Sequence, residues 1–148
     1  MIVKFTLRPD QADPSGFDLG DMLWSGESGK ATSVGHVPDQ GMVIHLSVVL
    51  LLDSLRGLMQ GRSTTASCVG VDSSFRLTFR STKAGISVTS TSGKLAVVSR
   101  AALAATVLRA AEELADDTLE ALPAHDGVRD DYEAALSEFR ATGWGHGA

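Results

Sequence analysis

Residues 24–32, Trp-Ser-Gly-Glu-Ser-Gly-Lys-Ala-Thr, contain a Gly-Lys pair in a Gly/Ser-rich stretch, as a nucleotide-binding phosphate loop does. That loop requires Gly, four residues and then Gly-Lys-Ser/Thr, because its amides and lysine surround the phosphates while the hydroxyl binds magnesium. Here Trp24 stands where the first glycine is required, and Ala31 replaces the hydroxyl residue. The stretch also lies between turn-rich segments rather than before a helix, whose N-terminus would meet the anion. The pattern therefore indicates a surface loop around Gly29 and Lys30.

Cys68 is the single cysteine, so the chain cannot form an internal disulfide bond. A catalytic thiolate needs a neighbouring base, or a helix N-terminus that lowers its pKa. Cys68 lies instead within a strand-like segment. We predict a buried structural thiol, and a chain without disulfides is typical of a reducing cytoplasm.

The histidines form no recognisable metal or catalytic motif. No two have the i, i+4 spacing of a helical metal-binding pair, and there is no Gly-x-Ser-x-Gly segment for a serine nucleophile. His36 with Asp39, or His125 with Asp126, would supply metal ligands, but we favour the simpler interpretation that both pairs are turn residues near a helix cap. We therefore predict no metal, no cofactor and no catalytic residue.

Carboxylates give the strongest non-random pattern. Residues 101–148 hold ten acids against three arginines, a balance of −7, whereas residues 1–100 hold eight acids and ten basic residues, a balance of +2. Together they give the formal net charge of −5. This charge argues against nucleic acid as a partner, because phosphate binding depends on lysine and arginine.

The acids gather around the end of one expected helix and the start of the next. Negative charge is favourable beside the exposed amides of a helix's first turn, so a solvated helical hairpin explains the pattern without a function. The alternative is an acidic docking surface that attracts a basic protein partner, with steering that weakens in salt. We assign this surface to Glu112, Glu113, Asp116, Asp117, Glu120, Asp130, Asp131 and Glu133.

A second hypothesis is a small-ligand-binding protein or small enzyme with a pocket between the sheet and the central helix. Pockets combine apolar walls with a few polar groups, and His45, Asp53 and Arg56 lie on one narrow polar stripe of the expected helix. His45 on a mostly apolar helix is alternatively a hydrogen-bonded core residue. A third hypothesis is a homo-oligomer joined through an unpaired sheet edge.

The elements that must position these residues follow from the apolar periodicity. Residues 2–8 alternate between apolar and polar and predict a half-buried strand. Residues 10–40 are rich in Gly, Asp, Ser and Pro, so we expect loops there and one short strand near 30–37. The apolar segment 41–52 falls short of the roughly 20 residues of a membrane span. It predicts a buried helix from Pro38-Asp39 to about Gln60, ended by Gly61.

Four short strand segments with tight turns predict an antiparallel meander over about residues 66–98, because parallel strands would need long crossovers. Its outward row of Arg76, Thr78 and Arg80 is typical of the solvated face of a sheet. Ser99 is a favourable N-cap for a helix that ends near 122–123. A last helix spans roughly 127–141, and we expect residues 143–148 to be a flexible tail.

Together these elements predict an α+β fold in a single domain of residues 1–148. A mostly antiparallel sheet of five to six strands packs against one buried central helix and two C-terminal helices. The chain has no signal-peptide pattern, and its Ala, Gly, Val and Arg usage indicates a GC-rich bacterial genome. Small size, acidic charge and absence of catalytic groupings are typical of bacterial immunity and adaptor proteins. Our leading hypothesis is a non-enzymatic cytoplasmic binding protein that engages a protein partner, with no nucleic acid and no membrane involved.

Overall fold

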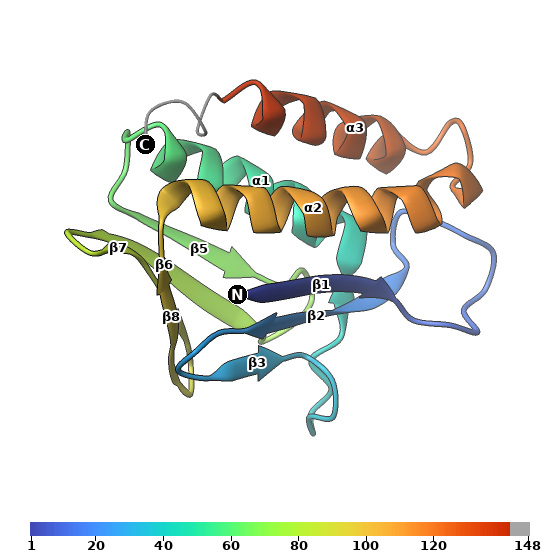
Figure 1. Cartoon of the computed structure of the whole chain (residues 1–148). Helices are drawn as coiled ribbons and strands as arrows, with labels where there is room; N and C mark the ends of the chain where they lie inside the picture. The colour runs from blue at the N-terminus through green and yellow to red at the C-terminus, as the bar shows by residue number, and fades with distance from the viewer. Residues whose placement is uncertain (143–148) are drawn as a thin grey trace.

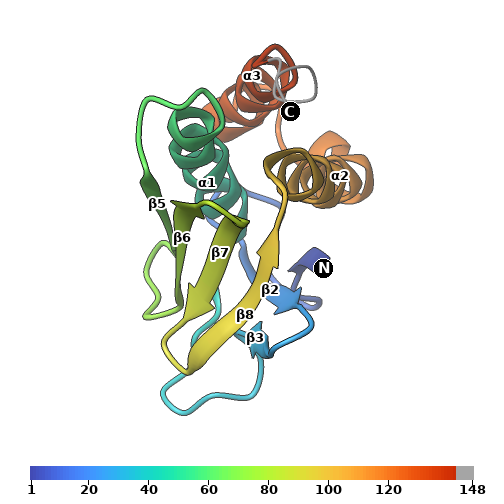
Figure 2. The same cartoon turned by 60° about the vertical axis from the view of Figure 1, so that its left-hand side comes forward.

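In the computed structural model, which describes residues 1–142, eight strands and three α-helices form an α+β fold (Figure 1). The predicted fold class is thus confirmed. The helices lie together on one side of the molecule and the strands on the other (Figures 1 and 2). The strands form two four-stranded sheets, where the sequence predicted one sheet of five to six strands. The predicted tail at 143–148 lies outside the described residues.

The first sheet is built around its central strand β2 (Leu19–Ser25). Strand β1 (Ile2–Leu7) pairs along one edge of β2, and the short strands β3 (Lys30–Thr32) and β4 (Met42–Val43) pair with β2 as well. All three pairings are antiparallel. Val3 and Phe5 are buried while their neighbours in β1 are exposed, as the alternation predicted.

The sequence analysis missed β2, because Gly20 and Asp21 are residue types that are depleted in strands. Tertiary contacts specify both residues. A side chain on Gly20 would collide with the backbone carbonyl of Thr6 and with Ile44, so only glycine allows this close approach. Asp21 is buried and accepts two hydrogen bonds from Arg8.

The second sheet is the predicted meander. Strands β5 (Thr65–Val69), β6 (Arg76–Thr82), β7 (Gly85–Ser90) and β8 (Gly93–Val98) pair antiparallel in sequence order. Gly85 and Gly93 have φ angles of +134° and +137°, a conformation that favours glycine, and they open β7 and β8. Arg76 and Arg80 of β6 are exposed and its Leu77 and Phe79 are buried, as predicted.

Three helices form the second layer. They are α1 (Ile44–Met59), α2 (Arg100–Thr118), which a short 3-10 turn (Leu119–Ala121) extends, and α3 (Gly127–Arg140). Helix α1 starts later than the predicted 38–39 because Met42 and Val43 pair with β2 instead. It ends as predicted before Gly61, whose φ is +74°. Ser99 caps α2, accepting a hydrogen bond from the Ala102 amide at 3.1 Å.

The core lies between the two sheets and the helices. The ring of Trp24 in β2 lies 6.1 Å from that of Phe5 in β1 and 5.6 Å from that of Phe79 in β6, centroid to centroid. These contacts join the two sheets, and large aromatic side chains contribute strongly to core stability. Helix α1 packs on β5 and α3, and α2 packs on β1. None of the helices among the described residues is long and apolar enough to cross a membrane.

Candidate functional site

The charge asymmetry along the sequence becomes an asymmetry in space. Helices α2 and α3, which carry the predicted acidic surface, lie in the helical layer (Figure 1). The opposite side is formed by the sheets, whose strands carry several of the basic residues: Lys4, Lys30, Arg76, Arg80 and Lys94. The fold therefore separates acidic helices from basic strands.

A shallow groove of about 430 Å³ runs between α2 and α3. Its apolar lining comes from Ala115, Leu119 and Leu136. Its polar lining consists of three predicted acids and two arginines: Asp116, Glu120, Glu133, Arg129 and Arg140.

Two ion pairs lie at this groove, but they do not neutralise all of its carboxylates. Arg140 Nη2 lies 2.8 Å from Glu112 Oε2, and Arg129 Nε lies 3.9 Å from Glu133 Oε1. Exposed pairs of this kind contribute at most about 1 kcal/mol to stability. Asp116 and Glu120 form no ion pair within the described residues. Unpaired carboxylates thus remain at the groove.

A second groove of about 350 Å³ lies on the other flank of α3, against α1. Its apolar lining includes Leu50, whose side chain is 49% exposed although it is large and apolar. Asp53, Asp131 and Glu138 line it as well. Partial burial and the nearby Glu138 carboxylate raise the pKa of Asp53, and Arg56 opposes this shift. Negative charge is therefore crowded beside an exposed leucine.

The structure brings some of the predicted acids together and separates others. Asp116, Glu120 and Glu133 share the α2–α3 groove, with Glu112 attached through Arg140, whereas Asp131 lies in the α1–α3 groove. The other three are exposed and line neither groove: Glu113, Asp117 and Asp130.

The sequence analysis missed the apolar part of the α1–α3 groove. Helical spacing would have revealed it, because residues at i, i+4 and i+7 share one helix face. Leu46, Leu50 and Asp53 have this spacing on α1, and Asp131, Ala135 and Glu138 have it on α3.

The three residues of the predicted pocket face the other helices rather than the sheet. Arg56 Nη1 pairs with Glu138 of α3 at 3.1 Å, and Asp53 lines the α1–α3 groove. His45 is fully buried and lies edge-on to the Tyr132 ring, at 5.8 Å between centroids. The structure thus does not gather these groups between α1 and the sheet.

His45 instead has the contacts of a hydrogen-bonded core residue. Its Nε2 lies 2.8 Å from Thr118 Oγ1. The Thr118 hydroxyl donates its own proton to the Leu114 carbonyl, so Nε2 carries the proton of the imidazole and Nδ1 is bare. Nδ1 is buried and has no hydrogen-bond partner among residues 1–142. Burial lowers the pKa of His45, while the charges of Asp18 and Asp126 oppose the shift.

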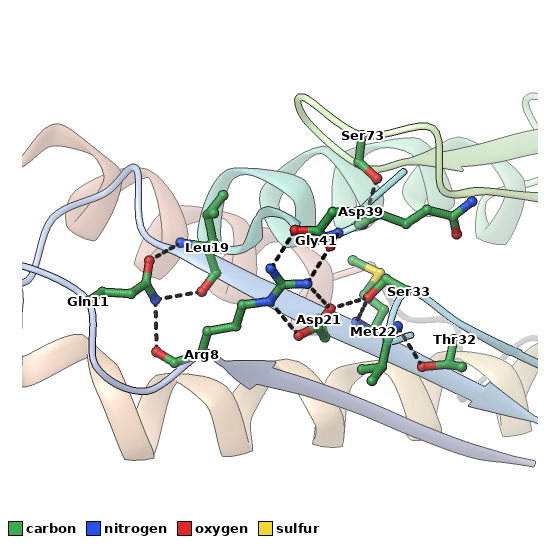
Figure 3. A network of polar contacts seen from close by, with 12 residues as sticks. Arg8, Gln11, Leu19, Asp21, Met22, Thr32, Ser33, Asp39, Gly41 and Ser73 are labelled. Carbon is green, nitrogen blue, oxygen red and sulfur yellow. Dashed lines mark hydrogen bonds and ion pairs between the residues drawn. The ribbon is translucent and has the colours of Figure 1, made fainter. Parts of the chain in front are cut away.

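Figure 3 shows a network of polar contacts, and we call the four residues at its centre the Arg8 node: Arg8, Asp21, Ser33 and Asp39. The Arg8 guanidinium donates to Asp21 at 2.9 and 3.0 Å and to Asp39 at 2.8 Å twice. Ser33 Oγ donates to Asp21 at 2.7 Å. Hydrogen bonds from Arg8 lower the pKa of both carboxyl groups. The node fixes the 33–41 loop against β1 and β2.

The sequence analysis did not find the Arg8 node because its partners are distant in the chain. Asp21 lies 13 positions from Arg8, and Asp39 lies 31 positions from it. The sequence analysis considered Asp39 as a metal ligand beside His36 and as a turn residue at a helix start, but its carboxylate is engaged by Arg8 and by the Gly41 amide at 2.9 Å.

Other candidate reactive residues have structural roles. Cys68 is buried, as predicted, and burial raises the pKa of its thiol to about 12, so it is not a ready nucleophile. Asp126 caps α3, accepting from the Val128 amide at 3.0 Å and from the Gly16 amide at 2.8 Å. Within residues 1–142, no three His, Cys, Asp or Glu side chains converge in a way that suits a metal ion.

Comparisons with protein-family models, with curated proteins and with solved structures found no match for this chain.

Proposed function

We propose that this chain is a non-enzymatic binding protein whose helical layer engages a protein partner that carries basic side chains. The observation that supports this most strongly is the pair of grooves on the two flanks of α3, each combining apolar lining with carboxylates. Protein interfaces have this composition, with an apolar centre and a polar rim.

The α1–α3 groove suits a lysine or arginine side chain of the partner. Such side chains lay their aliphatic stems on apolar surface and keep the charged end exposed. Leu50 offers that surface, while Asp53 and Asp131 offer carboxylates within the same groove. The surrounding acids would steer the basic partner during approach, which accelerates association at low salt.

A second copy of the same chain is a poor occupant of this surface. It would present the same acids, and like charges facing each other across an interface oppose association. We therefore favour a different protein as the partner, and oligomerisation through a sheet edge stays a separate prediction. Light scattering on the purified chain measures its oligomeric state.

A bacterial immunity or adaptor protein in the cytoplasm is the specific role that we propose. Immunity proteins that neutralise a basic toxin use an acidic surface, and the exposed acids of α2 and α3 would supply one here. A large secreted toxin encoded beside this chain's gene would support the immunity role, whereas a metabolic operon would favour ligand binding.

A charge-reversal experiment tests the proposed surface. The variant D116K/D131K changes one carboxylate in each groove, and D13K/E27K makes the same change in net charge at two exposed positions outside the helices. All three proteins are used to capture partners from a lysate of the encoding organism, and the captured protein is then identified, purified and titrated. We expect wild type and D13K/E27K to bind alike and D116K/D131K to bind at least about tenfold more weakly, which corresponds to about 1.4 kcal/mol.

Salt provides an independent check on the same complex. Raising the salt concentration should weaken binding to the wild type, because exposed charges are screened. Binding that resists both salt and D116K/D131K would contradict the proposed surface.

A further inference from the structure

The strand side of the molecule contains a basic cleft that the proposed function does not use. It encloses about 260 Å³ and lies where β3 of the first sheet, the 33–41 loop and the β7–β8 turn of the second sheet approach one another. Lys30, His36 and Arg76 line it together with the hydroxyl residues Ser74, Thr91 and Ser92. No Asp or Glu is among its lining residues.

The cationic side chains of the cleft are not neutralised by the protein. Lys30 and Arg76 are exposed and form no ion pair with any described residue. This contrasts with Arg8 nearby, which two carboxylates engage. In a chain of net charge −5, such a local excess of positive charge favours an anionic ligand.

The cleft also offers uncharged donors. The hydroxyls of Ser74, Thr91 and Ser92 make no hydrogen bond within the described part of the chain. His36 is oriented by a contact of 2.7 Å between its Nε2 and the Thr32 carbonyl. Because a carbonyl oxygen only accepts, Nε2 carries a proton and the ring is held in place.

The walls of the cleft are held by contacts outside it. The Arg8 node fixes Asp39 in the loop that carries His36 (Figure 3). Ser73 Oγ donates to the Gln40 carbonyl at 2.6 Å, which joins this loop to the turn before β6. The cleft is therefore largely formed before a ligand arrives, which reduces the entropy lost on binding.

We propose that this cleft binds the phosphate group of a small molecule. Arg76 would contribute a planar fork of donors suited to phosphate oxygens, and Lys30 would contribute a point charge. The site differs from a phosphate loop, because side chains from two sheets rather than the amides of a helix N-terminus surround the anion. Its volume exceeds that of the phosphate group alone, so a short organic substituent fits beside the anion.

Titration calorimetry with two probes tests this site. Inorganic phosphate and glycerol 3-phosphate are each titrated into the full chain at constant ionic strength, with sodium chloride as the reference. The variants are Arg76→Gln and Lys30→Gln, and the control is Arg80→Gln, an exposed arginine of the same strand that does not line the cleft. All three substituted positions are exposed, and thermal melts verify that every variant is folded.

We expect saturable binding of at least one probe by wild type and Arg80→Gln. Arg76→Gln and Lys30→Gln should each weaken it about tenfold or more, as the loss of a charged hydrogen bond predicts. Tighter binding of glycerol 3-phosphate would identify a phosphomonoester as the ligand, and equal binding would identify free phosphate. Absence of saturable binding for both probes, or equal weakening by Arg80→Gln, would overturn the proposal.

Discussion

The Arg8 node and the acidic helical surface both combine arginines with carboxylates, but in opposite settings. In the node, the Arg8 and Asp21 side chains are only 28% and 12% exposed, and the same guanidinium also binds Asp39, which is 61% exposed. On the helices, Arg140 and Glu112 are 49% and 40% exposed, and several acids have no basic partner among the described residues. The Arg8–Asp21 pair is shielded from water and anchors the guanidinium that holds Asp39 of the loop, whereas the solvated acids of the helices leave charge available to a partner.

Removing the arginine from each setting should give the largest difference in the free energy of unfolding. Arg8→Met leaves Asp21 shielded from water without its cation, so we expect a loss of about 2–3 kcal/mol in the free energy of unfolding. Arg140→Met removes only an exposed pair and should change it by less than about 1 kcal/mol. Urea unfolding measures both, and equal losses would refute the distinction.

Two buried titratable groups, His45 and Asp21, should respond to pH in separate windows. Burial lowers the pKa of His45 below its usual 6.5, so the unfolded chain binds a proton first as the pH falls below 6.5. Stability is then lost at up to about 1.4 kcal/mol per pH unit until the folded-state pKa is reached. Hydrogen bonding to Arg8 lowers the pKa of Asp21 below its usual 3.8, so its contribution is present above that pH and lost below it.

His45→Gln should therefore flatten the stability curve just below pH 6.5 and leave the loss below about pH 4 unchanged. Urea unfolding at successive pH values gives both slopes. If the slope just below pH 6.5 persists in the variant, another group is responsible for it.

Two acids at the start of α3, its N-cap Asp126 and Asp130 in its first turn, should also differ in how much they contribute to stability, but by a smaller amount. Asp126 accepts hydrogen bonds from the Val128 and Gly16 amides, whereas Asp130 is exposed in the first turn. Asp126→Ala should cost about 1 kcal/mol, the usual effect of losing an N-cap, and Asp130→Ala a few tenths. Thermal or urea unfolding distinguishes them, and a larger loss for Asp130→Ala would reverse the assignment.

Neutralising the solvated acids should have the smallest effect on stability. Asp116→Asn, Asp117→Asn and Asp131→Asn should each change the free energy of unfolding by no more than about 0.5 kcal/mol, because they lie on the surface without a cap or buried partner. Urea unfolding provides the measurement. A loss above about 2 kcal/mol for any one of them would mean that the carboxylate is structural.

Elements with local signals were predictable from the sequence, and elements specified by distant contacts were not. The alternation of β6, the Ser99 cap and Gly61 at the end of α1 depend on a few adjacent residues, and all three were predicted. Strand β2 contains Gly20 and Asp21, and both residue types are required by contacts that are distant in the chain. Thr6 and Ile44 approach Gly20 closely, and Arg8 and Ser33 donate hydrogen bonds to Asp21.

The candidate sites also combine features that the sequence shows directly with features that depend on distant contacts. The acids of α2 and α3 were visible as a charge pattern, but their distribution between two grooves depends on how α3 packs between its neighbours. The basic cleft joins residues from 30 to 92, and no spacing rule connects them. Lys30 was examined only as part of a phosphate loop, where the context is a helix rather than a second sheet, and it was assigned to a surface loop.

Because α2 packs on β1, the apolar face of β1 cannot be covered until α2 has been synthesised. The ribosome produces Val3 and Phe5 before the helix that covers their strand, because that helix begins at Arg100. At a synthesis rate of roughly 5–20 residues per second, these apolar side chains stay uncovered for several seconds before α2 has been made. Nascent chains arrested before α2 should therefore bind chaperones through the first strand, and full-length chains should not.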